Sequence, residues 1–170
     1  MSVSDVEEIK LNNGDLLSRA KRHFELEETE QALTACLSYL DSHPDDTTAL
    51  RLKANIFAVE GRLMEAVETI NKVLELTTSA EPCDYFYRGR WLLRNGHTRE
   101  SCTDFDKVVE LSLKYGDAYY LDTARLHLAY SQVILGQKSQ AKDTLSLIDE
   151  DCTTSINDSI VDKNRLLKML

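Results

Sequence analysis

Histidines and cysteines are the residues of this chain best suited to catalysis or metal binding, but their spacing supports neither. The four histidines, His23, His43, His97 and His127, include no pair at metal-ligand spacing on one helix face. The four cysteines form no C-x-x-C pair, and the sequence lacks P-loop, G-x-G-x-x-G and G-x-S-x-G motifs. We therefore predict a protein that is not an enzyme and that holds no metal or cofactor.

The composition predicts an all-α domain. Of the 170 residues, 42% are hydrophobic and 29% charged, with only 6 glycines and 2 prolines. Strictly alternating β-branched runs are absent. The net charge of -9 disfavours nonspecific binding to nucleic acid or to an anionic membrane. No apolar run is long enough for a membrane span, and the first residues lack the features of a signal peptide, so we expect a cytoplasmic protein.

A helix-turn-helix unit recurs along the chain with a period of about 34 residues. In the clearest copy, Leu50, Ala54 and Phe57 mark the first helix, Gly61 the turn and Ala66 the second helix. In the first copy, Glu27 replaces the turn glycine. The copies are expected over residues 13–46, 47–81, 82–115 and 116–150.

The two ends of the chain and the fourth copy need separate predictions. Residues 1–12 are expected to form a tail or a short helix. The fourth copy contains extra residues, which are expected to lengthen its first helix from Gly116 onward. Ser155 and Asp158 resemble a capping box, so a helix is predicted over 155–170 that covers the exposed face of the last hairpin.

The repeated pattern resembles the tetratricopeptide repeat (TPR), a helix-turn-helix with W-x2-L-G-x2-Y, then A-x3-F, then proline. The resemblance covers residues 13–150. It implies an all-α, right-handed α-solenoid of about four hairpins plus a C-terminal capping helix, with the first helices lining a concave groove. Small residues should let paired helices approach closely. They are Ala20, Ala54, Gly89 and Ala129 on the first helices, and Ala32, Ala66, Ser101 and Ala141 on the second helices.

Several residues depart from the family pattern. Arg19, Lys53 and Arg88 stand where leucine is usual, just before the small residue of the first three copies. Arg125 and Gln132 replace a large apolar residue and an aromatic residue in the fourth copy. The fourth copy is therefore the least regular.

Charge is distributed unevenly between the two sets of helices. The first helices considered are 13–26, 47–60 and 82–95, and the second helices are 28–41, 61–76 and 97–114. The first helices hold 8 Lys or Arg against 4 Asp or Glu, whereas the second helices hold 5 against 10. A basic inner layer could bind an acidic segment, a carboxylate terminus or an acidic helix of a partner. Alternatively, neighbouring acids neutralise an ordinary solvated helix face.

The candidate binding residues lie beside the core positions of the first helices. They are Lys21, Phe24, Arg51, Asn55, Phe86, Arg90, Arg94 and Tyr130, with Leu93 as an alternative to Arg94. Lys21, Arg51, Asn55 and Arg90 match the residue types of the carboxylate clamp in chaperone-binding TPR proteins, but not its arrangement. Phe86 is predicted to be an apolar anchor beside these cations.

Three functions are compatible with this pattern. The favoured one is a non-catalytic scaffold, an adaptor or co-chaperone, that binds an acidic peptide or partner protein in its concave groove. The first alternative is a stoichiometric guard, either a secretion chaperone or an immunity protein that neutralises a toxin. The second is a structural module that associates with itself. No nucleic-acid or membrane partner is expected.

Overall fold

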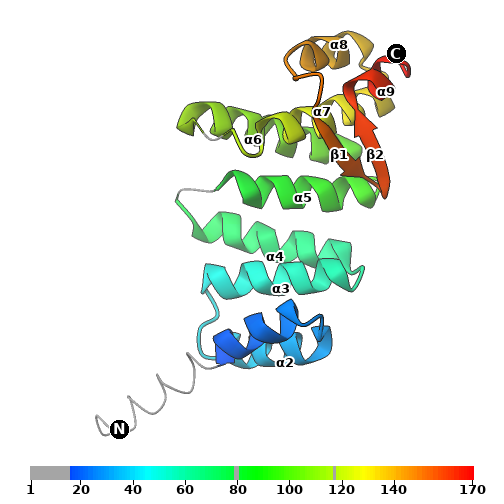
Figure 1. Ribbon diagram of the computed structural model, residues 1–170. Coiled ribbons are helices and arrows are strands. Elements are labelled where there is room, and N and C mark those ends of the chain that lie inside the picture. Colours follow the sequence, from blue (N-terminus) through cyan, green and yellow to red (C-terminus); the bar gives the residue numbers. More distant parts are fainter. Residues whose placement is uncertain (1–15, 79–80, 117) are drawn as a thin grey trace, which may run out of the picture. The chain divides into compact units, whose positions relative to one another are not determined.

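The computed structural model of the chain describes residues 16–78, 81–116 and 118–170 (Figure 1). These residues belong to two compact units, which we describe separately. Unit 1 spans residues 1–78 and unit 2 spans residues 79–170. The tail or helix predicted over 1–12 lies outside the described residues.

The described part of unit 1 is a set of paired helices. Its elements are a helix over residues 16–25, α2 (Thr29–Leu40), α3 (Thr47–Val59) and α4 (Leu63–Leu76). Ala20 and Ala32 have no exposed surface, and neither have Ala54 and Ala66. Their small side chains let the paired helices pack closely, since the distance between helix axes depends on the residues at the contact.

Unit 2 contains helices followed by a short hairpin. Its elements are α5 (Pro82–Arg94), α6 (Thr98–Tyr115), α7 (Leu121–Ile134), α8 (Lys138–Ser146), β1 (Thr153–Ile156), β2 (Ser159–Asp162) and α9 (Lys163–Leu167). Helices α5 and α6 meet at Gly89, where an added Cβ would lie 3.1 Å from Asp104 Cβ and 3.1 Å from Phe105 Cε1. The prediction of an all-α helical-repeat fold is confirmed for the repeats.

All four turns between paired helices use the same backbone geometry. Gly61, Gly96 and Gly136 have φ values of 77°, 84° and 73°, and Glu27 adopts 61° at the corresponding place. The residue after each of them donates its N–H to a carbonyl of the preceding helix, as Arg62 N does to Phe57 O at 2.8 Å and Glu28 N to His23 O at 2.9 Å. This is the Schellman ending of a helix, which favours glycine because the left-handed region is costly for other residues.

Glu27→Gly is therefore expected to stabilise unit 1 by about 1 kcal/mol, because glycine removes the strain of a left-handed residue. Hydrogen exchange of the α2 amides measures the change. Glu25→Gly is the matched control, since residue 25 is helical, and it should destabilise by about 1 kcal/mol. A loss of stability in Glu27→Gly would contradict this account of the turn.

The prediction that the extra residues of the fourth copy lengthen its first helix is wrong. They extend α6 instead, which continues through buried Leu111 and Ser112 to Tyr115 and ends at Gly116 with φ 69°. Helix α7 begins only at Leu121. Gly116 is a helix C-cap, because glycine adopts the left-handed conformation without strain.

The predicted helix over 155–170 is also wrong over its first half. Residues 153–162 form an antiparallel hairpin in which Ile156 pairs with Ser159 and Thr153 with Asp162. Asn157 and Asp158 form the two-residue turn with φ values of 48° and 63°, as in a type I′ turn. Only α9 is helical, and its N-cap is Asp162, whose Oδ1 accepts the N–H of Arg165 at 2.7 Å. Ser155 therefore starts no helix.

Polar departures from the repeat pattern connect α7 to α8. Arg125 Nη1 donates to Asp122 Oδ1 at 2.9 Å and to the carbonyl of Leu147, just after α8, at 2.8 Å. Gln132 Oε1 accepts the hydroxyl of Thr144 at 2.9 Å. These hydrogen bonds explain why the fourth copy accommodates polar residues at positions that are usually apolar.

Candidate functional site

Four of the candidate residues lie on the two first helices of unit 1. Lys21 and Phe24 belong to the helix over 16–25, and Arg51 and Asn55 lie one turn apart on one face of α3. Lys21 is exposed, and the other three are partly exposed. Unit 1 thus places two cations and an amide where solvent reaches them.

The start of α3 is fixed by Asp46. Its Oδ1 accepts the N–H of Ala49 at 2.9 Å and its Oδ2 accepts the hydroxyl of Tyr39 at 2.9 Å. Burial acts to raise the pKa of Asp46, but these hydrogen bonds outweigh it and hold the pKa below its usual value. The cap therefore carries a carboxylate at neutral pH and orients the helix that bears Arg51 and Asn55.

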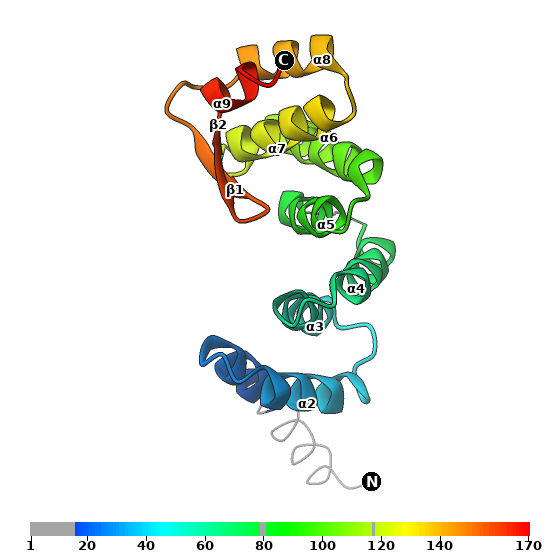
Figure 2. The same cartoon turned by 90° about the vertical axis from the view of Figure 1, so that its right-hand side faces the viewer.

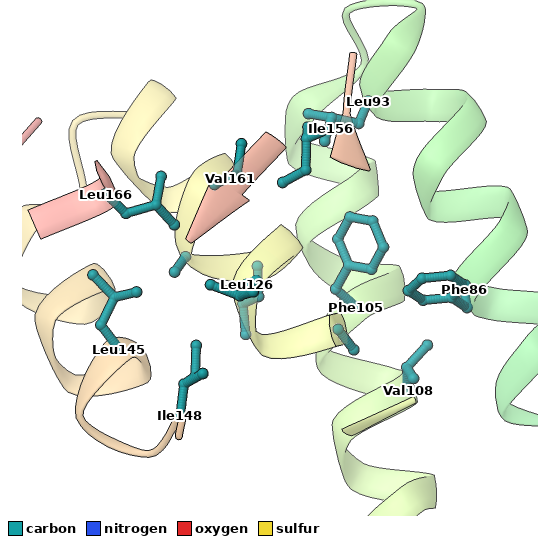
Figure 3. Packing of buried hydrophobic residues seen from close by; sticks show 13 residues of the cluster. Phe86, Leu93, Phe105, Val108, Leu126, Leu145, Ile148, Ile156, Val161 and Leu166 are labelled. Carbon is teal, nitrogen blue, oxygen red and sulfur yellow. The ribbon is translucent and has the colours of Figure 1, made fainter. Parts of the chain in front are cut away.

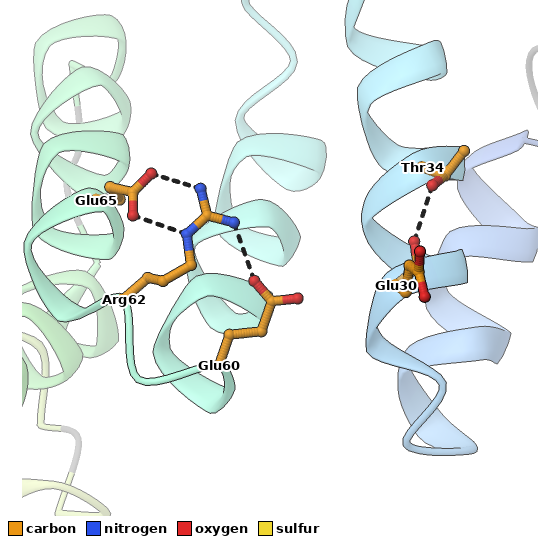
Figure 4. A network of polar contacts seen from close by, with 5 residues as sticks. All are labelled: Glu30, Thr34, Glu60, Arg62 and Glu65. Atoms are coloured by element: carbon orange, nitrogen blue, oxygen red, sulfur yellow. Dashed lines mark hydrogen bonds and ion pairs between the residues drawn. The ribbon is translucent and has the colours of Figure 1, made fainter.

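Two other cations of unit 1, Arg62 and Lys72, pair with acids of their own unit. Arg62 donates from Nε to Glu65 Oε2 at 2.7 Å and from Nη1 to Glu60 Oε2 at 3.0 Å (Figure 4). These bonds raise the pKa of Arg62, with Glu65 contributing most. Lys72 Nζ lies 2.9 Å from Asp45 Oδ1. In contrast, no carboxylate among the described residues pairs with Lys21.

The other four candidates lie in unit 2, and one of them is not accessible. Phe86 retains only 6% of its surface exposed. Its ring packs against Phe105, Tyr120 and His127, with centroids 6.0, 5.0 and 5.3 Å away. The prediction of Phe86 as an exposed anchor is therefore wrong. Tyr130 is partly buried against the same core cluster.

Arg90 and Arg94 remain exposed on α5, but their surroundings differ. Arg90 lies over the Phe86 ring, 5.8 Å from its centroid, and pairs with no carboxylate in the part of the chain that the structure describes. Arg94 Nη2 lies 3.7 Å from Oδ2 of Asp158 in the hairpin turn. One of the two candidate arginines of α5 thus already has an acidic neighbour.

That acidic neighbour belongs to a hairpin that the sequence analysis missed. Figure 2 shows the hairpin on the side of α5 and α7 away from α6, and β1 contacts α7. Ile156 and Val161 join the buried cluster that contains Leu93 and Leu126 (Figure 3). We call this side of α5 and α7, with Leu93, Arg94 and Leu126, the inner face of unit 2.

Unit 2 also contains buried polar groups. Arg88, one of the departures from the repeat pattern, pairs with Asp104 between α5 and α6. His127 is buried, and its Nδ1–H donates to the carbonyl of Thr123 at 2.8 Å. The Arg88–Asp104 pair joins α5 to α6, and the His127 hydrogen bond lies within α7.

The described residues contain neither a metal-binding cluster nor a membrane-spanning helix. No cluster of three or more histidine, cysteine or acidic side chains there could hold a metal ion. No helix there combines the length and apolar character needed to cross a membrane. A pocket of about 660 Å³ lies between the helix over 16–25 and α2, lined by Arg19, His23 and Glu30 among others, and none of the eight candidate residues lines it.

Comparisons with known proteins identify the fold but not a sequence family. No protein-family model matches the chain, and no curated protein matches its sequence. Solved structures do match. YrrB, a TPR protein with an unusual peptide-binding site, superposes with a TM-score of 0.70 at 18% identity, over 84% of this chain and 70% of its own.

Two further structures give the same result. The protein MamA matches with a TM-score of 0.69 at 15% identity, over 79% of this chain and 69% of its own. The first TPR domain of RPAP3 (Spaghetti), bound to the HSP90 peptide SRMEEVD, matches with a TM-score of 0.63 at 17% identity, over 73% of this chain and 93% of its own. The chain therefore has the fold of TPR proteins.

Proposed function

We propose that the protein is a non-catalytic scaffold that binds acidic segments of a partner protein through its first helices, those of unit 1 and those of unit 2 each considered by themselves. The observation that carries the proposal is the state of Lys21 and Arg90. Both side chains are exposed on first helices, and both lack a carboxylate partner among the described residues, as do the exposed second-helix residues Arg99, Lys114 and Lys142. In contrast, Arg62, Lys72, Arg88 and Lys107 are paired. Cations left without counter-ions favour an external anion.

Two similar structures support this proposal by analogy. The RPAP3 domain binds SRMEEVD, a peptide with three carboxylate side chains, and YrrB has a peptide-binding site. Arg51 and Asn55 supply a guanidinium and an amide one helical turn apart, which suits a carboxylate or a peptide backbone.

Charge reversal at Lys21, Arg51 and Arg90, each to glutamate, tests the proposal. We expect the triple variant to lose roughly 100-fold in affinity for acidic heptapeptides, because opposite charges become like charges. The affinity is measured by the amount of protein bound to an array of acidic heptapeptides that includes SRMEEVD, with the Asn/Gln counterpart of each peptide beside it. Arg99, Lys114 and Lys142 to glutamate is the matched control, with the same charge change on exposed residues of α6 and α8.

Two results would contradict the proposal. One is equal retention of the acidic peptides and their amide counterparts by the wild type. The other is unchanged retention by the triple variant while circular dichroism shows it to be folded. A pull-down from native lysate then distinguishes an adaptor, which recovers several partners that share an acidic segment, from a guard, which recovers one stoichiometric client.

A further inference from the structure

The inner face of unit 2 is already occupied by the chain itself. Ile156 in β1 and Val161 in β2 both face the helices and retain only 3% and 2% of their surface exposed. On the opposite face of the hairpin, Ile160 retains 71%. The hairpin therefore presents an apolar side to α5 and α7 and a solvated side outward, as expected for strands with a period of two residues.

The tip of the hairpin adds a carboxylate to this contact. Asp158 follows Ile156 by two residues and places its Oδ2 3.7 Å from Arg94 Nη2. The side chains are 86% and 57% exposed, so the ion pair is a weak contact. The tip is thus held mainly by one aliphatic side chain, while α9 is anchored separately through buried Leu166.

We infer that the hairpin is an intramolecular occupant of a peptide-binding face on α5 and α7. Ile156 fills an apolar position beside Leu93, and Asp158 fills a cationic position at Arg94. An external segment that carries an aliphatic residue and, two residues later, a carboxylate would fill the same positions once the hairpin leaves. The inference deepens the proposed function and rests on it for the ligand, whereas the separate release of the hairpin needs no ligand.

The hairpin has the properties of an occupant of this face. A hairpin of two four-residue strands is not stable in water without packing, so β1 and β2 depend on the helices they cover. The helices depend less on the hairpin, because Phe86, Phe105 and Val108 are packed within α5, α6 and α7. The acidic tip meets an arginine, which is the same charge complementarity that the proposed function assigns to a partner.

Ile156→Asp and Ile160→Asp form a matched pair for the test. Both place a carboxylate in the hairpin, but only residue 156 is buried. Hydrogen exchange of the full chain is expected to show amides 153–162 exchanging at least about tenfold faster in Ile156→Asp and unchanged in Ile160→Asp, with α5 and α7 still protected in both. In Ile156→Ala, the exchange rates of amides 153–162 should also rise, but by less than in Ile156→Asp.

The ligand is tested with a peptide of residues 153–162, TTSINDSIVD. It should bind Ile156→Asp at least about tenfold more tightly than the wild type, where the face is filled. The peptide TTSDNKSIVD, with both contact residues changed, should not bind. Loss of protection in α5 and α7 together with the hairpin would overturn the inference, and so would equal peptide binding by the variant and the wild type. Neither result depends on Lys21 or Arg51, so failure here is distinguishable from failure of the proposed function.

Discussion

Replacing Arg88 with methionine is expected to lower the free energy of unfolding of unit 2 by about 3–5 kcal/mol. The guanidinium donates from Nε to Asp104 Oδ2 at 2.8 Å and from Nη2 to Oδ1 at 2.5 Å. Burial raises the pKa of Asp104 against the opposing effect of these hydrogen bonds. Without Arg88, the Asp104 carboxylate would remain buried with no counter-ion, which is the costly state of a broken ion pair.

Urea unfolding followed by the fluorescence of Trp91, the only tryptophan of the chain, measures this loss. Arg99→Met is the matched control, because Arg99 is an exposed arginine of α6, and it should change stability by less than about 0.5 kcal/mol. Adding Asp104→Asn to Arg88→Met removes the unpaired charge and should recover part of the loss. A loss below about 1 kcal/mol in Arg88→Met would contradict the importance of the pair.

Unit 2 is also expected to lose roughly 3 kcal/mol of stability between pH 7 and pH 4 through His127 alone. The ring lies against Phe86 and Phe105, with centroids 5.3 and 4.9 Å away. Burial lowers the pKa of His127 to about 4, the hydrogen bond to Thr123 opposes this shift, and the charge of Arg90 adds to it. The folded state therefore keeps the imidazole neutral.

The direction of this pH dependence follows from the two pKa values of His127. Above the reference pKa of 6.5 the ring is neutral in both the folded and the unfolded chain, so His127 contributes no pH dependence there. As the pH falls from 6.5 toward 4, the unfolded chain binds a proton that the folded chain excludes. Stability then falls by about 1.4 kcal/mol per pH unit.

Trp91 fluorescence in urea at pH 7 and at pH 4.5 isolates this contribution. His127→Gln keeps a hydrogen-bond donor but does not titrate, so it should lose roughly 2–3 kcal/mol less than the wild type over this range. His97→Gln changes a histidine whose side chain is 42% exposed and should behave like the wild type. Equal losses in the wild type and His127→Gln would contradict the account.

The helical repeats could be predicted because their signals are local. Leu50, Ala54 and Phe57 fall on one helix face by spacing alone, and turn residues such as Gly61 require a left-handed backbone that glycine provides. Even the irregular first turn is explained by this rule, since Glu27 adopts the positive φ of the glycine that it replaces. Local spacing also indicates that Arg51 and Arg90 lie beside core positions.

The hairpin was missed although its sequence contains a signal. The run TTSINDSIVD has β-branched residues on both sides of Asn157 and Asp158, and these two residues suit a two-residue turn. Ser155 and Asp158 also fit a helix start, and short segments of this kind are ambiguous on propensity alone. The outcome depends on burial of Ile156 and Val161 against α5 and α7, and that packing is not visible in local sequence.

The error at Phe86 has the same origin. Phe86 follows Tyr85, which takes a core position of the repeat pattern. One step round the helix from a core position, Phe86 is expected beside the core if α5 is considered alone. Tyr120 and His127, which cover it, come from the following helix pair. The burial of a residue on a first helix therefore depends on side chains of the next repeat.

Chemical-shift mapping of the wild-type protein with an acidic peptide tests the central claim most directly. In a titration with SRMEEVD and with its amide counterpart SRMQQVN, we expect shifts at the amides of Lys21, Arg51, Asn55 and Arg90 for the acidic peptide only, which weaken as salt is added. Shifts confined to α2, α4 and α6, or identical shifts with both peptides, would contradict binding of an acidic segment by the first helices.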